Sequence, residues 1–286
     1  MKLSEVTSYI RESLKDAGIT ESDGEARIIL REVADISPAQ ILSHPEMDID
    51  CDVQKRIEDI VNRRLMREPL QYILGSWDFM GLSFVVRPEV LIPRPDTEIL
   101  VESALEELHD GMRVLDLCTG TGCVIISLLK YSNGCEGVAV DISEHALALA
   151  KENAAAIIPD ETLEIIYSDL YENVEGEYDI IVSNPPYIDT DVIATLEPEV
   201  KDYEPHLALD GGDDGLDLVR RIIDEAGANL CCGGALLMEI GADQGERVCE
   251  LMRKAGFVDV ECVRDYAGLD RVVKGHKSFF EEWGIR

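Results

Sequence analysis

Basic residues are scarce in this 286-residue chain: Lys and Arg number 26 against 58 Asp and Glu, a formal net charge of −32. Proteins that bind nucleic acid neutralise its phosphates with Lys and Arg. The excess of acidic residues here therefore argues against nucleic-acid binding and against binding to an anionic membrane surface. No apolar run approaches the ~20 residues that span a bilayer. The first 16 residues are amphipathic and charged, without the apolar core of a signal peptide. We therefore expect a cytoplasmic protein, and the 46% hydrophobic share is ample for a folded core.

The sequence also lacks the residue patterns that are typical of metal sites and of catalytic nucleophiles. The eight cysteines contain no C-x-x-C pair, which argues against a zinc site or a thioredoxin-type centre. Five of them lie in apolar stretches and are expected to be small buried side chains: Cys118, Cys123, Cys135, Cys231 and Cys262. The five histidines are scattered without metal-ligand spacing, and no Ser/His/Asp triad is evident. We predict no metal.

The composition changes near residue 75. Residues 1–75 carry 10 basic and 15 acidic residues, whereas residues 76–286 carry 16 and 43. The first part is expected to be helical, with apolar residues at four-residue spacing and an N-cap at Ser37 followed by Pro38. One basic cluster is interpreted as a solvated helix face, with a role in holding a partner as the alternative: Lys55, Arg56, Arg63, Arg64 and Arg67.

Residues 76–92 alternate aromatic and β-branched side chains around Gly81, which predicts a β-hairpin linker. In the following Pro-rich loop, Asp96 or Thr97 is expected to cap a helix. From residue 111 onward strands and helices alternate, and the last two strands form a closing pair. This predicts an α/β fold with a mostly parallel sheet, helices on both faces and a C-terminal antiparallel pair.

A glycine-rich turn follows the first strand of that sheet, with the sequence Asp116-Leu117-Cys118-Thr119-Gly120-Thr121-Gly122. Such a turn lets the backbone approach a nucleotide-type cofactor. Ile125 occupies the position where a dinucleotide fingerprint requires a third Gly or Ala, and the phosphate-loop motif G-x-x-x-x-G-K-[ST] does not occur. Asp116 would repel a pyrophosphate but suits a cationic group. The turn therefore favours S-adenosylmethionine (SAM), which carries an ammonium and a sulfonium.

An acidic residue also stands at the end of each of the next two expected strands. Asp141 lies 21 residues beyond Gly120, where a carboxylate can accept ribose hydroxyls, and Asp169 lies where an adenine amino group is expected. Because the carboxyl ends of parallel strands meet at one edge, both acids are expected beside the glycine-rich turn.

The fourth strand runs into Asn184-Pro185-Pro186-Tyr187. The Asn184 side-chain oxygen and the Pro185 carbonyl can both accept hydrogen bonds from one NH₂ group, and Tyr187 can pack on a flat substrate. Two acceptors orient a poorly nucleophilic amide or aromatic amine and stabilise the positive charge that develops on its nitrogen. The residues thus indicate a SAM-dependent methyltransferase acting on a planar NH₂ group.

Eight segments across the chain resemble the peptide chain release factor N5-glutamine methyltransferases, the PrmC/HemK family. They are "IPRPDTE" (92–98), "VLDLCTGTG" (114–122), "VDIS" (140–143), "SDL" (168–170), "SNPPYI" (183–188), "DYEPHLALDGGDDGLD" (202–217), "EIGADQGE" (239–246) and "LDRVVKG" (269–275). The resemblance covers the whole chain. It implies a helical substrate-docking domain over 1–75, the hairpin linker and a methyltransferase domain over 93–286.

The resemblance also implies roles for particular residues. The substrate is expected to be the glutamine of the Gly-Gly-Gln loop of class 1 release factors, held by residues 184–187. The turn from Cys118 to Gly122, with Asp141, Leu170 and Asn184, is expected to bind SAM, and Arg94 to border its pocket. One departure is Cys118, because this position is often Gly in the family. The side chain there must point away from SAM or narrow its pocket.

Three alternatives stay open at this point. A ribosomal-protein glutamine methyltransferase would use the same chemistry. An N6-adenine DNA methyltransferase would need the basic surface that this chain lacks. A non-catalytic SAM-sensing module would be expected to lose the Asn184 motif, which is intact here.

Overall fold

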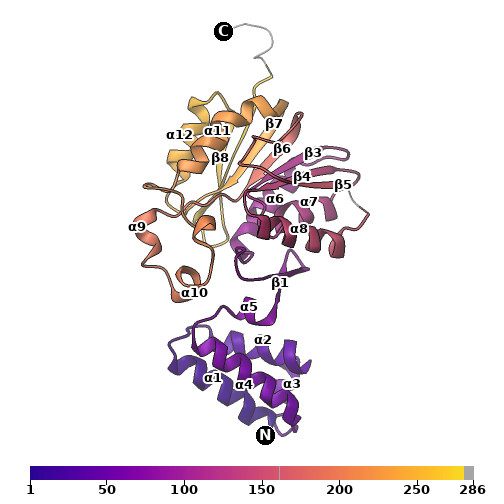
Figure 1. Cartoon of the computed structure of the whole chain (residues 1–286), viewed down its shortest axis with the longest axis vertical. Helices are drawn as coiled ribbons and strands as arrows, with labels where there is room; N and C mark the ends of the chain where they lie inside the picture. The colour runs from indigo at the N-terminus through magenta and orange to yellow at the C-terminus, as the bar shows by residue number, and fades with distance from the viewer. Residues whose placement is uncertain (161, 280–286) are drawn as a thin grey trace. The chain divides into compact units, whose positions relative to one another are not determined.

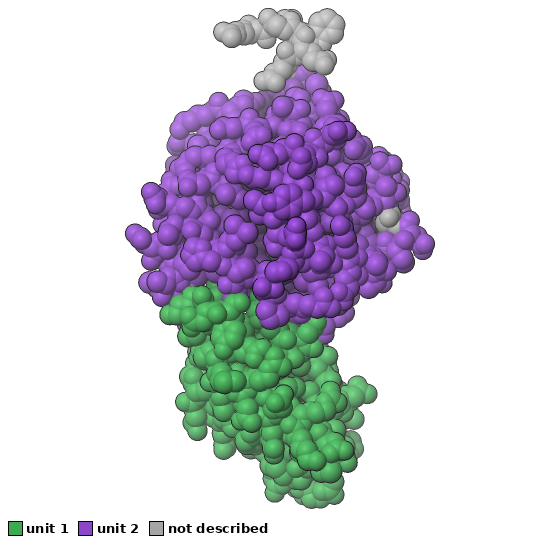
Figure 2. All heavy atoms as spheres, in the orientation of Figure 1, with its two compact units in different colours: residues 1–75, 198–203 green, residues 76–197, 204–286 purple. Residues whose placement is uncertain are grey.

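The computed structural model describes residues 1–160 and 162–279, and these form two compact units. The first comprises Met1–Gly75 together with Pro198–Tyr203, and the second comprises Ser76–Glu197 together with the residues from Glu204 onward, as the two colours of Figure 2 show. A six-residue piece of the second half of the sequence therefore belongs to the first unit.

The first unit is a helical bundle, as its apolar periodicity predicts. Its helices are α1 (Leu3–Asp16), α2 (Ser22–Ala34), α3 (Pro38–Ser43), α4 (Cys51–Leu65), α5 (Leu70–Leu74) and α10 (Pro198–Lys201). Leu3, Ile10, Ile29 and Val61 lie in its fully buried core. The expected cap of α3 is confirmed, because the Ser37 hydroxyl accepts a hydrogen bond from the Gln40 amide.

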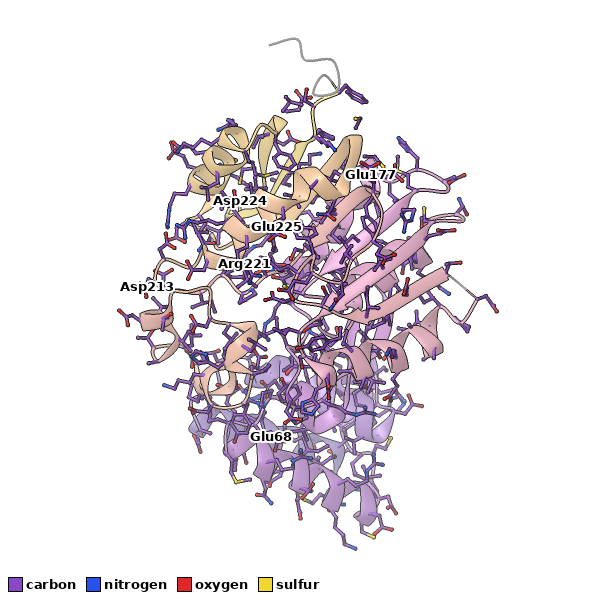
Figure 3. All side chains as sticks on the ribbon, turned by 45° about the horizontal axis from the view of Figure 1, so that its top comes forward. Glu68, Glu177, Asp213, Arg221, Asp224 and Glu225 are labelled. Atoms are coloured by element: carbon purple, nitrogen blue, oxygen red, sulfur yellow. The ribbon has the colours of Figure 1, made fainter. Side chains whose placement is uncertain are left out.

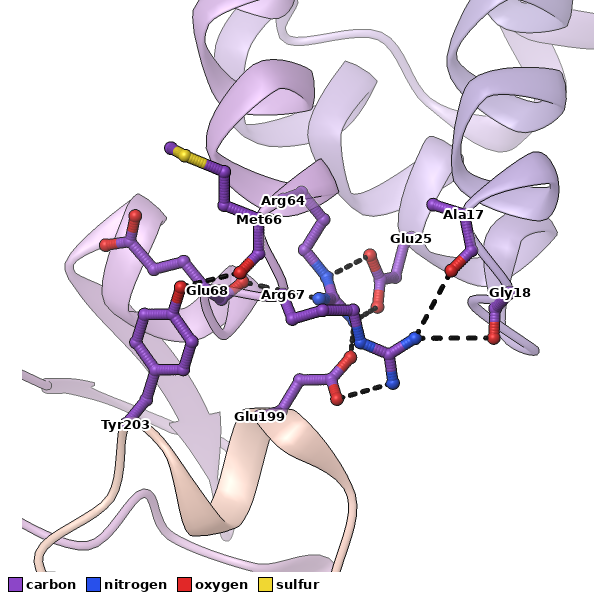
Figure 4. Close-up of polar contacts among 9 residues, drawn as sticks. All are labelled: Ala17, Gly18, Glu25, Arg64, Met66, Arg67, Glu68, Glu199 and Tyr203. Carbon is purple, nitrogen blue, oxygen red and sulfur yellow. Dashed lines mark hydrogen bonds and ion pairs between the residues drawn. The ribbon is translucent and has the colours of Figure 1, made fainter.

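The interpretation of the basic cluster as a solvated face is wrong for Arg64, which is only 4% exposed. Its guanidinium donates to both carboxylate oxygens of Glu25, at 2.9 and 3.0 Å, and to Glu199 of α10 at 2.7 Å. Arg67 binds the other oxygen of Glu199 at 2.6 Å (Figure 4). The Tyr203 hydroxyl donates to the Met66 carbonyl in the same region. These contacts hold residues 198–203 within the helical unit.

The second unit is built on a seven-stranded sheet of order β5-β4-β3-β6-β7-β9-β8 (Figure 1). Its strands are β3 (Arg113–Leu117), β4 (Glu136–Asp141), β5 (Thr162–Tyr167), β6 (Tyr178–Ser183), β7 (Leu230–Glu239), β8 (Val258–Arg264) and β9 (Asp270–His276). The first five pair in parallel, whereas β9 is antiparallel to both β7 and β8. The predicted mostly parallel sheet with a C-terminal antiparallel pair is confirmed.

Helices pack on both faces of this sheet. One buried cluster joins α11 (Asp217–Asn229) and α12 (Gly245–Lys254) to the strands, and another joins α6 (Glu98–Glu107) and α7 (Cys123–Lys130). The remaining helical elements are α8 (Glu144–Ile157), α9 (Thr190–Ile193), η1 (Pro95–Thr97) and η2 (His206–Ala208). The predicted hairpin is confirmed as β1 (Ser76–Phe79) and β2 (Leu82–Val85). No described helix of the chain has the length and apolar character needed to cross a membrane.

Candidate active site

A pocket lies beside the carboxyl ends of β3, β4 and β6, where α/β sheets bind ligands. Its empty space measures about 920 Å³ with the open mouth included. Among the residues that line it are nine of the predicted site residues: Arg94, Asp116, Cys118, Thr119, Gly120, Thr121, Asp141, Asn184 and Pro186. Apolar side chains, including Val90, Ile92, Val124 and Leu218, form much of the rest.

The turn after β3 needs left-handed backbone at three positions. Cys118, Gly120 and Gly122 have φ angles of 59°, 56° and 80°. Gly122 also fills a close contact, because a Cβ there would lie 2.8 Å from Ile126 Cδ1 and 3.3 Å from Ala150 Cβ. Glycine is therefore required at 122 for packing as well as for conformation. Cys118 adopts the left-handed backbone despite its side chain, which lines the pocket and packs against the core beneath.

The carboxyl group of Asp116 lines this pocket, and the residue is only 1% exposed. The Thr119 hydroxyl donates to its Oδ2 at 2.6 Å. Burial raises the pKa of Asp116 to about 7, and the Thr119 hydrogen bond opposes that rise. A buried carboxyl of this kind is stabilised in its ionised form by a neighbouring cation.

Asp141 lies at the end of β4 and organises the same turn. Its Oδ2 accepts from the Gly120 amide and its Oδ1 from the Ser143 amide, both at 2.9 Å. Burial raises the pKa of Asp141, and these backbone hydrogen bonds lower it. Two confined carboxyl groups beside apolar walls fit a cationic nucleoside such as SAM and disfavour a pyrophosphate.

Asp169 and Leu170 follow β5 but are not among the residues that line the pocket. Asp169 Oδ1 accepts from Arg221 of α11 at 3.0 Å, and Arg221 is labelled in Figure 3. Leu170 is buried, with a φ of 51°. Gly122, Pro185 and Tyr187 also lie outside the lining. Contact of these residues with a cofactor or substrate stays a prediction.

Asn184 leaves the end of β6 into the pocket. Its side-chain nitrogen donates to Thr97 Oγ1 at 3.2 Å, and its side-chain oxygen accepts no hydrogen bond from the described residues. Pro185 and Pro186 are buried and carry no N–H group. The oxygen of Asn184 is therefore available for a donor that enters the pocket.

The expected helix cap before α6 is wrong in its detail. Neither Asp96 nor Thr97 makes a side-chain capping bond; η1 precedes the helix, and Thr97 instead accepts from Asn184. Sequence reasoning missed this role, because a Thr before a helix is ordinarily interpreted as a cap.

Tyr187 is held by two residues that sequence reasoning assigned no role. Its hydroxyl donates to Glu239 Oε1 at 3.0 Å, and its carbonyl accepts from Gln244 at 2.9 Å. Both residues belong to the segment "EIGADQGE" at the end of β7, whose resemblance to the family was the only signal for them.

The Arg94 guanidinium forms a short ion pair with the carboxylate of Glu204, a residue that is only 6% exposed. Burial raises the pKa of Glu204, and Arg94 lowers it. Pro205 and Leu207, just beyond Glu204, line the pocket together with Arg94. The pair joins two walls of the pocket that are 110 residues apart in sequence.

Two family models match the chain. The PrmC N-terminal domain matches residues 5–75, and the methyltransferase small domain matches residues 95–198.

Curated relatives match almost the whole chain. It is 41% identical over 269 residues to "Release factor glutamine methyltransferase" of Agrobacterium fabrum, covering 92% of this chain and 93% of the relative. It is 44% identical over 260 residues to the protein of the same name from Cereibacter sphaeroides, covering 91% and 93%. A solved methyltransferase from Pyrococcus furiosus has a TM-score of 0.54 at 18% identity, covering 80% of this chain and all of that one, which shows a shared fold.

Proposed function

The chain belongs to the family of release factor glutamine methyltransferases, and from this premise we propose its reaction in full. The enzyme transfers a methyl group from SAM to the side-chain nitrogen (N5) of the glutamine in the Gly-Gly-Gln motif of class 1 peptide chain release factors. The observation that carries the proposal is Asn184, whose side-chain oxygen is unpaired among the described residues at a pocket lined by the buried carboxyl group of Asp116 and the half-buried one of Asp141.

The cofactor supplies an electrophilic methyl group when it is bound. Asp116 and Asp141 provide negative charge for its cationic groups and its ribose hydroxyls, and the turn from Cys118 to Gly122 allows close backbone approach. The apolar side chains of Val90, Ile92 and Leu218 line much of the remainder of the pocket.

The substrate amide is a weak nucleophile because its lone pair is delocalised. Asn184 Oδ1 and the Pro185 carbonyl accept hydrogen bonds from its NH₂ group and present the nitrogen face to the methyl group. The same acceptors stabilise the positive charge that develops on nitrogen during transfer. Transfer is direct, without a covalent enzyme intermediate. The methylated nitrogen then loses its proton to water.

We assign docking of the protein substrate to the helical unit, which matches the PrmC N-terminal domain. With a net charge of −32, the enzyme complements a basic patch on a protein partner better than a nucleic-acid substrate.

The test is methyl transfer from labelled SAM to a purified class 1 release factor, beside a factor with Gln→Ala in its Gly-Gly-Gln loop. We expect label on the unaltered factor alone. Equal label on both factors would contradict the target residue. If neither factor is labelled although SAM still binds, the proposal of a release factor as substrate is contradicted. A ribosomal protein and then DNA would be tried in the same assay.

A further inference from the structure

A buried glutamine, Gln244, joins three segments of the chain that are far apart in sequence. The residue is only 4% exposed and lies directly before α12. Its side-chain nitrogen donates to the Tyr187 carbonyl at 2.9 Å and lies 3.5 Å from the Gly215 carbonyl, and its side-chain oxygen accepts from the Gly241 amide at 2.8 Å. Carbonyl groups only accept and backbone N–H groups only donate, so these neighbours fix the orientation of the Gln244 amide.

Two glycines leave the space that this amide occupies. A Cβ at Gly215, whose φ is 70°, would overlap the Tyr187 carbonyl oxygen and lie 2.6 Å from the side-chain nitrogen of Gln244. A Cβ at Gly241 would lie 3.1 Å from the Cδ and the Oε1 of Gln244. The amide is therefore packed directly against backbone, and a group of another shape would have to move that backbone.

Tyr187 is held at its other end by Glu239. The Tyr187 hydroxyl donates to Glu239 Oε1 at 3.0 Å, and Glu239 is the last residue of β7 and only 1% exposed. Burial and the neighbouring carboxylate both raise the pKa of the Tyr187 hydroxyl, so this group stays a neutral donor. The carbonyl and the ring of Tyr187 are thus both bound to the short segment 239–244.

We propose that Gln244 is a positioning residue for methyl transfer, which fixes the backbone of the Asn184–Tyr187 segment through the Tyr187 carbonyl. Pro185 and Pro186 have no N–H groups, so no amide hydrogen bond can hold the middle of this segment. The direction of the Pro185 carbonyl then depends on how the residues after it are held. Gln244 is not among the described residues that line the pocket, so its effect passes through Tyr187.

The inference rests on the proposed function, because the Asn184 oxygen and the Pro185 carbonyl are the acceptors of that reaction. Their placement decides how the substrate nitrogen meets the methyl group, and a misplacement of about 1 Å can cost about 100-fold in rate. The cofactor, in contrast, is assigned to Asp116 and Asp141 at the ends of other strands. Loss of the Gln244 hydrogen bond should therefore lower kcat without weakening SAM binding.

Gln244→Met and Gln244→Glu test the hydrogen bond with side chains of nearly the same size. Met removes the donor and the acceptor, whereas Glu places a carboxylate oxygen against the Tyr187 carbonyl. At pH 8 and saturating SAM, we expect kcat to fall about 10- to 100-fold in both variants. The dissociation constant for SAM should change less than about threefold. The exposed neighbour Asp243 supplies the control, because Asp243→Asn should leave both quantities unchanged.

A merely structural role predicts a different division of the effect. Destabilised protein would bind SAM at fewer sites, and kcat per SAM-binding site would stay as in the wild type. Titration with SAM counts those sites in each variant. An unchanged kcat per site in both Gln244→Met and Gln244→Glu would overturn the proposal.

The pH profile of Gln244→Glu gives a second distinction. A protonated carboxyl group has an O–H that can donate to the Tyr187 carbonyl, so lower pH should restore activity. Burial raises the pKa of the introduced group, and the Asp189 carboxylate, 2.8 Å from the Cβ position of Gly215, adds to that rise. Relative to the wild type, kcat of Gln244→Glu should rise about fivefold or more from pH 8 to pH 6. Gln244→Met has no titratable group at this position, and its ratio to the wild type should stay level. A level ratio for both variants would contradict the proposal.

A further measurement does not depend on the substrate. The Tyr187 carbonyl carbon can be followed by NMR in protein labelled with carbonyl-¹³C tyrosine and ¹⁵N-isoleucine, because only three Tyr-Ile pairs occur in the chain. Tyr187→Phe assigns the signal. We expect it to move upfield in Gln244→Met, and to return toward its wild-type position in Gln244→Glu as the pH falls.

The outcomes separate this proposal from the proposed function. An unchanged Tyr187 carbonyl signal in folded Gln244→Met would overturn the role of Gln244. If that variant does not fold, the pH series of Gln244→Glu decides the same question. Wild-type protein that labels no release factor would overturn the proposed substrate, while the Tyr187 signal would still decide whether Gln244 holds the segment.

Discussion

Binding of SAM should be coupled to the ionisation of Asp116. The carboxyl group is fully buried and its pKa is raised to about 7 in the protein without ligand. A cationic ligand beside it favours the ionised form and returns the pKa toward its ordinary value of 3.8. Binding at slightly acidic pH must therefore release a proton, and affinity must fall as the pH falls.

The size of this loss of SAM affinity follows from the ionised fraction of Asp116 in the free protein. With a pKa of about 7, that fraction is about one half at pH 7 and about 1% at pH 5. If only the ionised form binds, the dissociation constant weakens about 50-fold between those values, which corresponds to about 2.3 kcal/mol. The ammonium group of the ligand stays protonated over this range, so the change belongs to the protein.

Isothermal titration calorimetry from pH 5 to 7, in two buffers of different ionisation enthalpy, measures affinity and proton release together. The variant Asp116→Asn should bind SAM more weakly at pH 7 and lose the steep pH dependence. S-adenosylhomocysteine keeps the ammonium group but lacks the sulfonium. Comparing the pH dependence of binding of the two ligands therefore shows which of the two cationic groups interacts with Asp116. A wild-type dissociation constant that changes less than about threefold over this range would refute the reasoning.

Three further changes test the site and its supports. Asn184→Ala should lose most methyl transfer to release factor while retaining SAM binding in part, and near-normal turnover would refute the role given to its side-chain oxygen. Gly122→Ala should destabilise the protein by about 1–3 kcal/mol in urea unfolding, because its φ is 80° and the added methyl would meet a neighbouring side chain 2.8 Å away. Glu199→Gln should cost about 1–3 kcal/mol in the same assay, since buried Arg64 would keep one carboxylate partner and lose another. The exposed control Asp202→Asn should be neutral.

The fold and the gathering of predicted site residues around one pocket could be predicted because both depend on local pattern. Alternating apolar strands and helices imply a mostly parallel sheet, and such a sheet places the carboxyl ends of β3, β4 and β6 at one edge. Asp116 lies one residue before the end of β3, Asp141 is the last residue of β4, and Asn184 follows β6 directly. Their presence around one pocket therefore needed no knowledge of distant contacts.

The buried Arg64 shows where local pattern fails. Its place on α4 among other basic residues is typical of a solvated face. Its partner Glu199 lies 135 residues away, in a segment that packs with the helical unit. Sequence spacing within one helix cannot reveal which exposed-looking cation will be covered by a distant segment.

The contacts that hold the Asn184–Tyr187 segment were likewise decided by tertiary structure alone. Asn184 and Thr97 are 87 residues apart, and Tyr187 and Glu239 are 52 apart. The sequence by itself determined the sheet, the glycine-rich turn and the Asn-Pro-Pro-Tyr segment at a strand end, because backbone conformation and apolar periodicity are local properties. The partners that orient these groups were settled only in the folded chain, because hydrogen bonds between buried side chains depend on which distant elements the core brings together.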